Sequence, residues 1–188
     1  MNLDTIQPVV LVGGKSRRFG RDKLREQLDG VTLVSRPIEA LRAVFGPRVA
    51  LVGECDAVVA ALGDLAIPDP YPGVGPAGGI LAALEHASGP VFVLSGDLPS
   101  ISPDVVRAIL DAAAGQPDAL ACLGYTDRPQ PCIALYRRSA AGSIREAMNS
   151  GGGLRRAIDD RRCVLVPIDP AEAVNVNRPG DLPRPSPR

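Results

Sequence analysis

Short apolar runs rich in valine alternate with segments of helical periodicity, and this alternation constrains the fold more than any other feature of the chain. The strand candidates are residues 7–12, 48–52, 65–69, 91–95 and 163–167, with further apolar stretches at 119–123 and 133–136. Strands that alternate with helices at this interval favour parallel pairing. The pattern therefore predicts a three-layer α/β/α fold with a mostly parallel central sheet.

The segments between these runs carry helix signals. Residues 31–45 place apolar side chains at helical spacing and stop at Gly46-Pro47, while Ser102 and Pro103 are typical of an N-cap and a first helical residue. We expect helices at about residues 56–62, 80–87, 103–115, 140–148 and 154–159, and a proline-glycine loop at 70–79. Residues 1–188 are expected to form one domain, with a frayed tail at about 184–188.

Composition argues against several classes of function. The 21 basic residues balance 21 acidic ones, aromatic residues make up 3% and tryptophan is absent, so no nucleic-acid partner is expected. No apolar run is long enough to span a membrane and no secretory signal is evident, which predicts a cytoplasmic protein. The four cysteines lack Cys-x-x-Cys spacing and are expected to be small buried hydrophobic residues without chemistry.

Three familiar motifs fail on their context. A Walker A loop ending in GGKS needs a glycine five places before Gly14, where the chain has Val9, inside the first strand candidate. The stretch GVGPAG matches a dinucleotide-binding pattern only formally, because it lies in a turn-rich loop with a proline. The serine of VLSGD is not in a Gly-x-Ser-x-Gly context, so no esterase-type nucleophile is indicated.

A basic glycine loop survives these tests. In LVGGKSRRFGRDK, glycines 13 and 14 follow the first strand candidate and would let the backbone approach a phosphate chain closely. Arg18 and Lys23 can neutralise its charge. The chain has only two lysines, Lys15 and Lys23, and both fall in this stretch. A glycine turn with a solvated basic face is the alternative, and the segment alone leaves both open.

Two carboxylates are expected at the same edge of the sheet as this loop. Asp97 follows the run at 91–95, and Asp69 ends the run at 65–69. Ligands of open α/β sheets bind outside the carboxyl ends of the strands. Mg²⁺ takes oxygen ligands, usually with only one or two protein carboxylates, and therefore suits this edge. A turn or capping role is the alternative for a lone aspartate after a strand.

The chain resembles the molybdenum cofactor guanylyltransferases, within the wider nucleotidyltransferases. The matching stretches are LVGGKSRRFGRDK, IPDPYPGVGPAGGI, LSGDLPSI, RPQPCIALYRRS and VNVNRPGDL, in the family's order over residues 10–182. The chain departs from the family with Val12 for alanine, Phe19 for methionine and Gly-Pro-Ala-Gly-Gly for Gly-Pro-Leu-Ala-Gly. The resemblance implies a single-domain nucleotidyltransferase fold.

The resemblance also implies roles for residues. The backbone of the first glycine loop and Lys23 would hold GTP, Asp69 would contact the nucleotide, and Asp97 would hold Mg²⁺. The Gly-Gly form of the loop favours guanine. The expected catalytic residues are Lys23, Arg18 and Asp97, and the expected binding residues are Leu11, Val12, Gly13, Gly14, Lys23, Asp69, Gly78, Asp97, Asn175 and Asn177.

The implied reaction transfers GMP from GTP to the terminal phosphate of molybdopterin and releases pyrophosphate. A phosphate monoester is largely dianionic at pH 7 and needs no general base. This fits a chain whose single histidine, His86, is expected to be a helix-surface or packing residue and not a catalyst or ligand. Asn175 and Asn177 either position the acceptor or metal-bound water, or cap the turn before Pro179.

Other readings stay open beside this one. The same scaffold could transfer another nucleotide to another phosphate, such as a sugar phosphate or phospholactate. The chain could also carry GTP or the pterin without chemistry. Further expected partners are other proteins of molybdenum cofactor biosynthesis and the molybdoenzymes that receive the product.

Overall fold

A central sheet of seven strands organises the computed structural model, which describes residues 1–13, 22–151, 153–158, 162–177 and 179–181. The strand order is β5-β4-β1-β6-β8-β7-β9. The strands are β1 Gln7–Leu11, β4 Ala50–Val52, β5 Leu65–Ile67, β6 Val91–Ser95, β7 Ala121–Tyr125, β8 Pro129–Tyr136 and β9 Cys163–Pro167. All the expected strands form, and the second and third of them, β4 and β5, are shorter than expected.

The sheet is parallel except for β8, which pairs antiparallel with both β6 and β7. Only residues 126–128 separate β7 from β8. So short a connection cannot make the crossover that a parallel pair needs, and the two strands form a hairpin. The mostly parallel sheet is thus confirmed.

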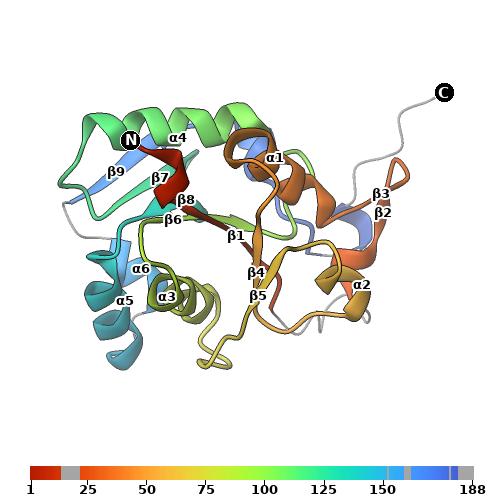
Figure 1. Cartoon of the computed structure of the whole chain (residues 1–188), viewed down its shortest axis with the longest axis horizontal. Coiled ribbons are helices and arrows are strands. Elements are labelled where there is room, and N and C mark those ends of the chain that lie inside the picture. Colours follow the sequence, from red (N-terminus) through yellow and green to blue (C-terminus); the bar gives the residue numbers. More distant parts are fainter. Residues whose placement is uncertain (14–21, 152, 159–161, 178, 182–188) are drawn as a thin grey trace.

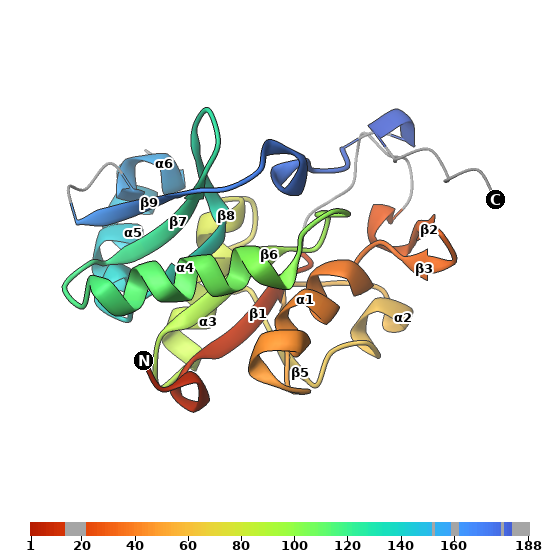
Figure 2. The same ribbon diagram turned by 90° about the horizontal axis from the view of Figure 1, so that it is seen from above.

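Helices cover both faces of the sheet and complete the expected three layers (Figures 1 and 2). One face carries α1 Ser35–Phe45 and α4 Pro103–Gly115, and the other carries α3 Pro76–His86, α5 Ala140–Asn149 and α6 Gly153–Ile158. Alternate strand residues feed the two cores: Val10 and Leu94 pack with the first set, and Val9 and Val93 with the second. Strands that are buried on both faces have continuous apolar sequences, and for this reason they could be predicted from the sequence.

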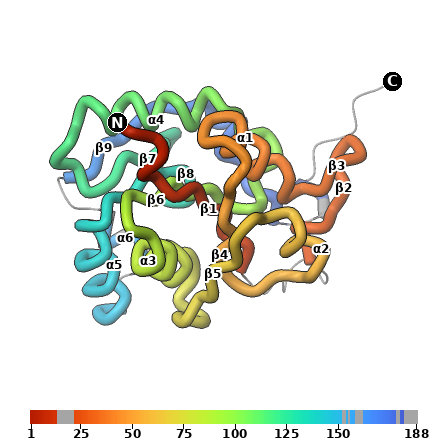
Figure 3. Tube along the Cα trace, in the orientation of Figure 1, coloured from red at the N-terminus to blue at the C-terminus, as the bar shows by residue number. Residues whose placement is uncertain are grey.

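Smaller elements lie at the ends of the molecule (Figure 3). The hairpin β2 Gln27–Leu28 and β3 Val31–Thr32 and the helix α2 Ala57–Ala60 lie at the end opposite α5 and α6. Short 3-10 turns occupy Leu3–Thr5, Lys23–Arg25, Pro170–Ala173 and Pro179–Asp181. None of the described helices is long and apolar enough to cross a membrane.

The starts of two helices differ from the expectation, and the expected N-cap of a third is confirmed without a side-chain bond. Helix α3 begins at Pro76, so the loop expected at 70–79 ends early; Pro76 sits at the start behind Gly75, whose φ of 71° suits glycine. Helix α1 begins at Ser35, because Asp29 and Gly30 have positive φ and turn the preceding chain into a hairpin. Ser102 is the N-cap of α4 but makes no side-chain capping bond.

Strand β8 begins at the carboxyl edge of the sheet because it runs antiparallel, and it is irregular near that edge. Leu123 pairs with Ala134, whereas the next residue, Gly124, pairs with Gln130, so residues 131–133 form a bulge. The buried Tyr136 hydroxyl donates to the Pro131 carbonyl at 2.8 Å and ties this bulge down. Burial raises the pKa of Tyr136 well above its usual value, which keeps the hydroxyl protonated as a donor.

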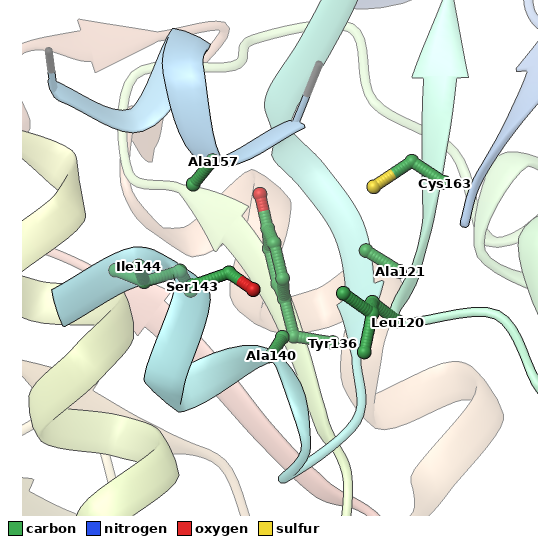
Figure 4. Close-up of a pocket in the computed structure, with 8 residues that line it drawn as sticks. All are labelled: Leu120, Ala121, Tyr136, Ala140, Ser143, Ile144, Ala157 and Cys163. Atoms are coloured by element: carbon green, nitrogen blue, oxygen red, sulfur yellow. The ribbon is translucent and has the colours of Figure 1, made fainter. Parts of the chain in front are cut away.

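The Tyr136 ring borders a small apolar cavity of about 10 Å³ between the sheet and helices α5 and α6 (Figure 4). Leu120, Ala121 and Cys163 line it from the start of β7 and β9, so it lies at the amino edge of the sheet. This cavity is therefore remote from the edge at which a ligand is expected.

Replacing Tyr136 by phenylalanine removes the tether and leaves a carbonyl in the bulge without this donor. We expect Tyr136→Phe to lower the free energy of unfolding by about 2 kcal/mol, because it loses the bond and leaves Pro131 unsatisfied. Urea unfolding followed by circular dichroism measures the difference. An unchanged midpoint would show that the hydroxyl bond does not support the bulge.

Candidate functional site

The carboxyl ends of β1, β4, β5 and β6 meet at one edge of the sheet, and the residues that follow them form the candidate site. In the register, Leu11 lies beside Val52 of β4 and Ser95 of β6, and Val52 lies beside Ile67 of β5. All four strands therefore end level with one another. The loops beyond them are brought together by the sheet itself.

An ion pair between Lys23 and Asp97 lies at the centre of this edge. The Lys23 Nζ is 2.5 Å from the Asp97 Oδ2, and the Ser95 hydroxyl donates to the other oxygen, Oδ1, at 2.5 Å. Asp97 is 7% exposed and is the only buried charged residue in the part of the chain that the structure describes. A carboxylate so buried requires partners, and each of its oxygens has one.

Local structure explains how Lys23 reaches this position. It begins a short 3-10 turn whose N-cap, Asp22, accepts a hydrogen bond from the Leu24 N–H at 3.0 Å. The Leu24 side chain is buried in the core, which turns the lysine toward the sheet edge. The structure thus brings together the expected residues Lys23 and Asp97.

A segment near the C-terminus closes over the ion pair. The Lys23 ammonium also donates to the Val176 carbonyl at 2.9 Å, and the Val176 N–H donates to the Asp97 carbonyl at 3.0 Å. The Val176 side chain is completely buried against Leu33. The backbone on either side carries Asn175 and Asn177, both exposed, so these two asparagines lie beside the ion pair in sequence and remain accessible.

The backbone at Asn177 is capped by a side chain of the following turn. The Asn177 N–H donates to the Asp181 carboxylate at 2.9 Å, so a side chain from the following 3-10 turn caps this backbone. A role for the two amide side chains toward an acceptor or metal-bound water stays a prediction.

The glycine loop after β1 is packed against the end of β4. The N–H groups of Val12 and Gly13 both donate to the Val52 carbonyl, at 3.0 and 3.2 Å, and the Leu11 carbonyl accepts from Gly96. The Gly13 N–H is therefore engaged within the sheet and does not offer itself to a phosphate. Gly14 and Arg18, the other expected members of this loop, lie outside the described residues.

Gly53 explains why this packing needs glycine on both sides. It has a φ of 102°, and a Cβ at this position would lie 2.7 Å from the Gly13 Cα and N atoms. Gly13 would in turn place a Cβ 3.2 Å from the Gly53 Cα. Gly53 was not among the residues expected in the site, although a glycine directly after a strand candidate often marks a close approach of another backbone.

Asp69 lies in the loop that connects β5 with α3, and Gly78 lies at the start of that helix. The half-buried Asp69 accepts a hydrogen bond from the Tyr71 N–H at 2.8 Å through Oδ1. Gly78, in the first turns of α3, would place a Cβ 2.9 Å from the Tyr71 Cβ, the Tyr71 carbonyl and the Val74 side chain. Asp69 therefore has the turn role that was considered for it. A nucleotide contact would use its other carboxylate oxygen, Oδ2.

Cys132 lies near Asp97 and was not among the residues expected in the site. Burial and, to a lesser extent, the Asp97 charge raise the pKa of the Cys132 thiol to about 12. It therefore stays a neutral thiol at pH 7. The expectation of buried cysteines holds fully for Cys122 alone, since the other three are only partly buried; all four are free.

The charged groups of this edge fit a Mg²⁺ ion that arrives with a nucleotide. Among the described residues, no three His, Cys, Asp or Glu side chains gather into a metal-binding group. Mg²⁺ in nucleotide sites is held by one or two carboxylates, with phosphates and water completing its shell. Asp97, a single carboxylate fixed by Ser95 and Lys23, is suited to this role and would hold the ion.

The fold and this edge define a nucleotidyltransferase, an enzyme with a glycine loop after its first strand and a lysine–aspartate pair at the end of its central strand. The family model of the MobA-like NTP transferase domain matches residues 8–164, and the chain belongs to this family. The match covers the whole sheet except the first residue of β1 and the end of β9.

Relatives and solved structures agree with the family. A probable molybdenum cofactor guanylyltransferase from Opitutus terrae is 28% identical and covers 97% of this chain and 96% of its own. One from Mycobacterium ulcerans is 31% identical, covering 94% and 91%. The crystal structure of molybdopterin-guanine dinucleotide biosynthesis protein A from Archaeoglobus fulgidus is similar with a TM-score of 0.76, at 26% identity and 94% coverage of both chains.

The close approach of Gly13 and Gly53 predicts that alanine at position 53 costs more stability than alanine at a glycine without close neighbours. Gly53→Ala combines a strained φ with a backbone clash and should cost about 3 kcal/mol of unfolding free energy. It should also weaken nucleotide binding, because Gly13, which it displaces, belongs to the glycine loop expected to hold the nucleotide.

Gly46→Ala is the matched control for this prediction. Gly46 has a φ of 83° but no atom within 4 Å of an added Cβ, so it carries the conformational cost alone, about 1 kcal/mol. Urea unfolding and nucleotide calorimetry of both variants test the difference. Equal losses in the two would show that the Gly13–Gly53 contact is unimportant.

Proposed function

We propose that this enzyme transfers GMP from GTP to the terminal phosphate of molybdopterin and so forms molybdopterin guanine dinucleotide. The observation that carries the proposal is the Lys23–Asp97 pair at the carboxyl end of β6, in a chain of the MobA-like family. The names of the relatives in Opitutus and Mycobacterium support the choice of guanine and of the pterin acceptor.

The reaction needs charge neutralisation and alignment more than proton transfer. A phosphate oxygen of molybdopterin attacks the α-phosphorus of GTP and forms a new P–O–P linkage, while the bond from that phosphorus to the β-phosphate oxygen breaks. Pyrophosphate leaves with the electron pair. The attacking phosphate monoester is largely dianionic at pH 7, so no side chain has to remove a proton.

The residues of the site would divide this work. Lys23 would neutralise charge on the phosphate chain, and Arg18 would assist it from the glycine loop. Asp69 would contact the nucleoside, with Leu11, Val12, Gly13 and Gly78 shaping its seat. Asp97 would hold Mg²⁺, which supplies Lewis-acid stabilisation of phosphate charge when bound.

His86 does not enter this mechanism. It is the last residue of α3 and is exposed, as the sequence predicted. The described side chains at and beside the ion pair are a lysine, an aspartate, a serine and a protonated thiol. A reaction that starts from an ionised phosphate needs no further base among them.

Two alternatives are separated by one assay. Pyrophosphate release from each of the four Mg-nucleoside triphosphates is measured with and without molybdopterin. Release from GTP that depends on molybdopterin supports the proposal, and release from another nucleotide or with another phosphate acceptor keeps the chemistry but changes the substrate. GTP binding without release from any nucleotide would favour a carrier.

Variants of the ion pair should abolish most turnover. We expect Asp97→Asn and Lys23→Ala each to lower kcat by about 10²-fold or more, because each removes a group that stabilises phosphate charge. Pyrophosphate release is compared at a temperature where circular dichroism shows every variant folded. Asp104→Asn, which changes an exposed carboxylate on α4, is the control. Rates like the wild type in either ion-pair variant would remove that residue from the mechanism.

A further inference from the structure

Tyr71 lies at the centre of the loop that carries Asp69. Its N–H donates to the Asp69 carboxylate, and its Cβ and carbonyl lie against Gly78 at the start of α3, so the same residue contacts two expected nucleotide-binding positions. Its half-buried side chain packs against the core beneath α3. The position of Tyr71 therefore sets the path of the loop.

The Tyr71 hydroxyl is anchored to helix α3. It lies 2.9 Å from both oxygens of Glu85 and donates to this carboxylate. Glu85 is about two helical turns beyond Gly78, near the end of α3, so the hydroxyl bond ties the loop to the C-terminal part of the helix. The Glu85 carboxylate raises the pKa of Tyr71, and the hydroxyl stays a donor at neutral pH.

A second helix fixes the acceptor of this bond. The Arg145 Nη2, on α5, lies 2.5 Å from the Glu85 Oε1. Helices α3 and α5 lie side by side on the same face of the sheet (Figure 1). An exposed ion pair of this kind adds little stability by itself, so its geometric effect on Glu85 is the more important one.

We propose that Tyr71, held by Glu85 and Arg145, is a positioning residue that sets the Asp69 loop against the start of α3 at Gly78 for nucleotide binding. This inference rests on the proposed function only in taking this loop as part of the nucleotide site. The network touches neither the Lys23–Asp97 pair nor the bulge of β8 in the described contacts. It should affect nucleotide affinity and leave the chemical step intact.

Tyr71→Phe tests the proposal because it removes one hydroxyl and keeps the ring. We expect the KM for the nucleotide and the Kd of the Mg-nucleotide to rise roughly fivefold to tenfold, with kcat within twofold of the wild type. Glu85→Ala should match it, and the double variant should add little, since both remove the same bond. Glu85→Gln retains an acceptor oxygen and should recover most of the affinity.

The controls separate positioning from general stability. Arg107→Ala breaks an exposed ion pair with Asp104 on α4, which covers the opposite face, and should leave KM and Kd unchanged. Arg145→Ala should raise both by less than Tyr71→Phe. An unchanged Kd in Tyr71→Phe overturns the proposal, as does a lower kcat and melting temperature at constant KM.

Calorimetry keeps this test independent of the proposed reaction. Each of the four nucleoside triphosphates with Mg²⁺ is titrated into the wild type, and the one that binds is used for the variants. A wild type that binds a nucleotide but does not transfer it to molybdopterin overturns the proposed function alone. A wild type that binds none of the four overturns both.

Discussion

The Lys23–Asp97 ion pair joins three segments of the chain that are far apart in sequence. Lys23 comes from the turn after the glycine loop, Asp97 from the end of β6, and Val176 from beyond the last strand. Each of these segments also inserts an apolar side chain beside the pair: Leu24, Leu98 and Val176 are all buried. The polar contact and the core therefore stabilise one another, and the geometry of the edge depends on both.

Nearly all other basic residues of the chain are arginines, and the chemistry of the ion pair explains why position 23 is a lysine. The ammonium is compact and has three donors, of which one contacts Asp97 and another the Val176 carbonyl. A planar guanidinium would need more room in this enclosed position. Removing either partner leaves a largely buried charge unpaired, which costs far more than an exposed pair contributes.

The sequence predicted the sheet and the carboxylates at its edge for one physical reason. Strands buried on both faces must be apolar throughout, so they stand out, and parallel strands end at one edge with their following residues together. The rule places Asp97 at this edge, whereas Lys23 reaches it from a 3-10 turn beyond the glycine loop. The hairpin of β2 and β3 was missed because it is short and half-exposed, although Asp29-Gly30 is a turn signal of the kind that hairpins use.

Long-range contacts were beyond such rules. Nothing in the sequence alone places Val176 against Leu33, or Arg145 of α5 beside Glu85 of α3, since both depend on how separate helices and loops pack. The start of α3 was misjudged because Pro76, Gly78 and Gly79 resemble loop residues. The small size of the last two is needed where the helix passes Tyr71 and Leu11.

The reversed direction of β8 divides the edge of the sheet into two parts. On one side, β1, β4, β5 and β6 end at this edge and supply the residues expected to bind the nucleotide and Mg²⁺. On the other, β8 begins there, so its bulge and Cys132 lie next to Ser95 and Asp97. The nucleotide loops are thus supported by parallel strands and α3, whereas the neighbouring part of the edge is supported by Tyr136 and the Val176 segment. Because β4, β1 and β6 lie between β8 and β5, which the Asp69 loop follows, a change in the β8 bulge can alter that side of the site without moving the Asp69 loop.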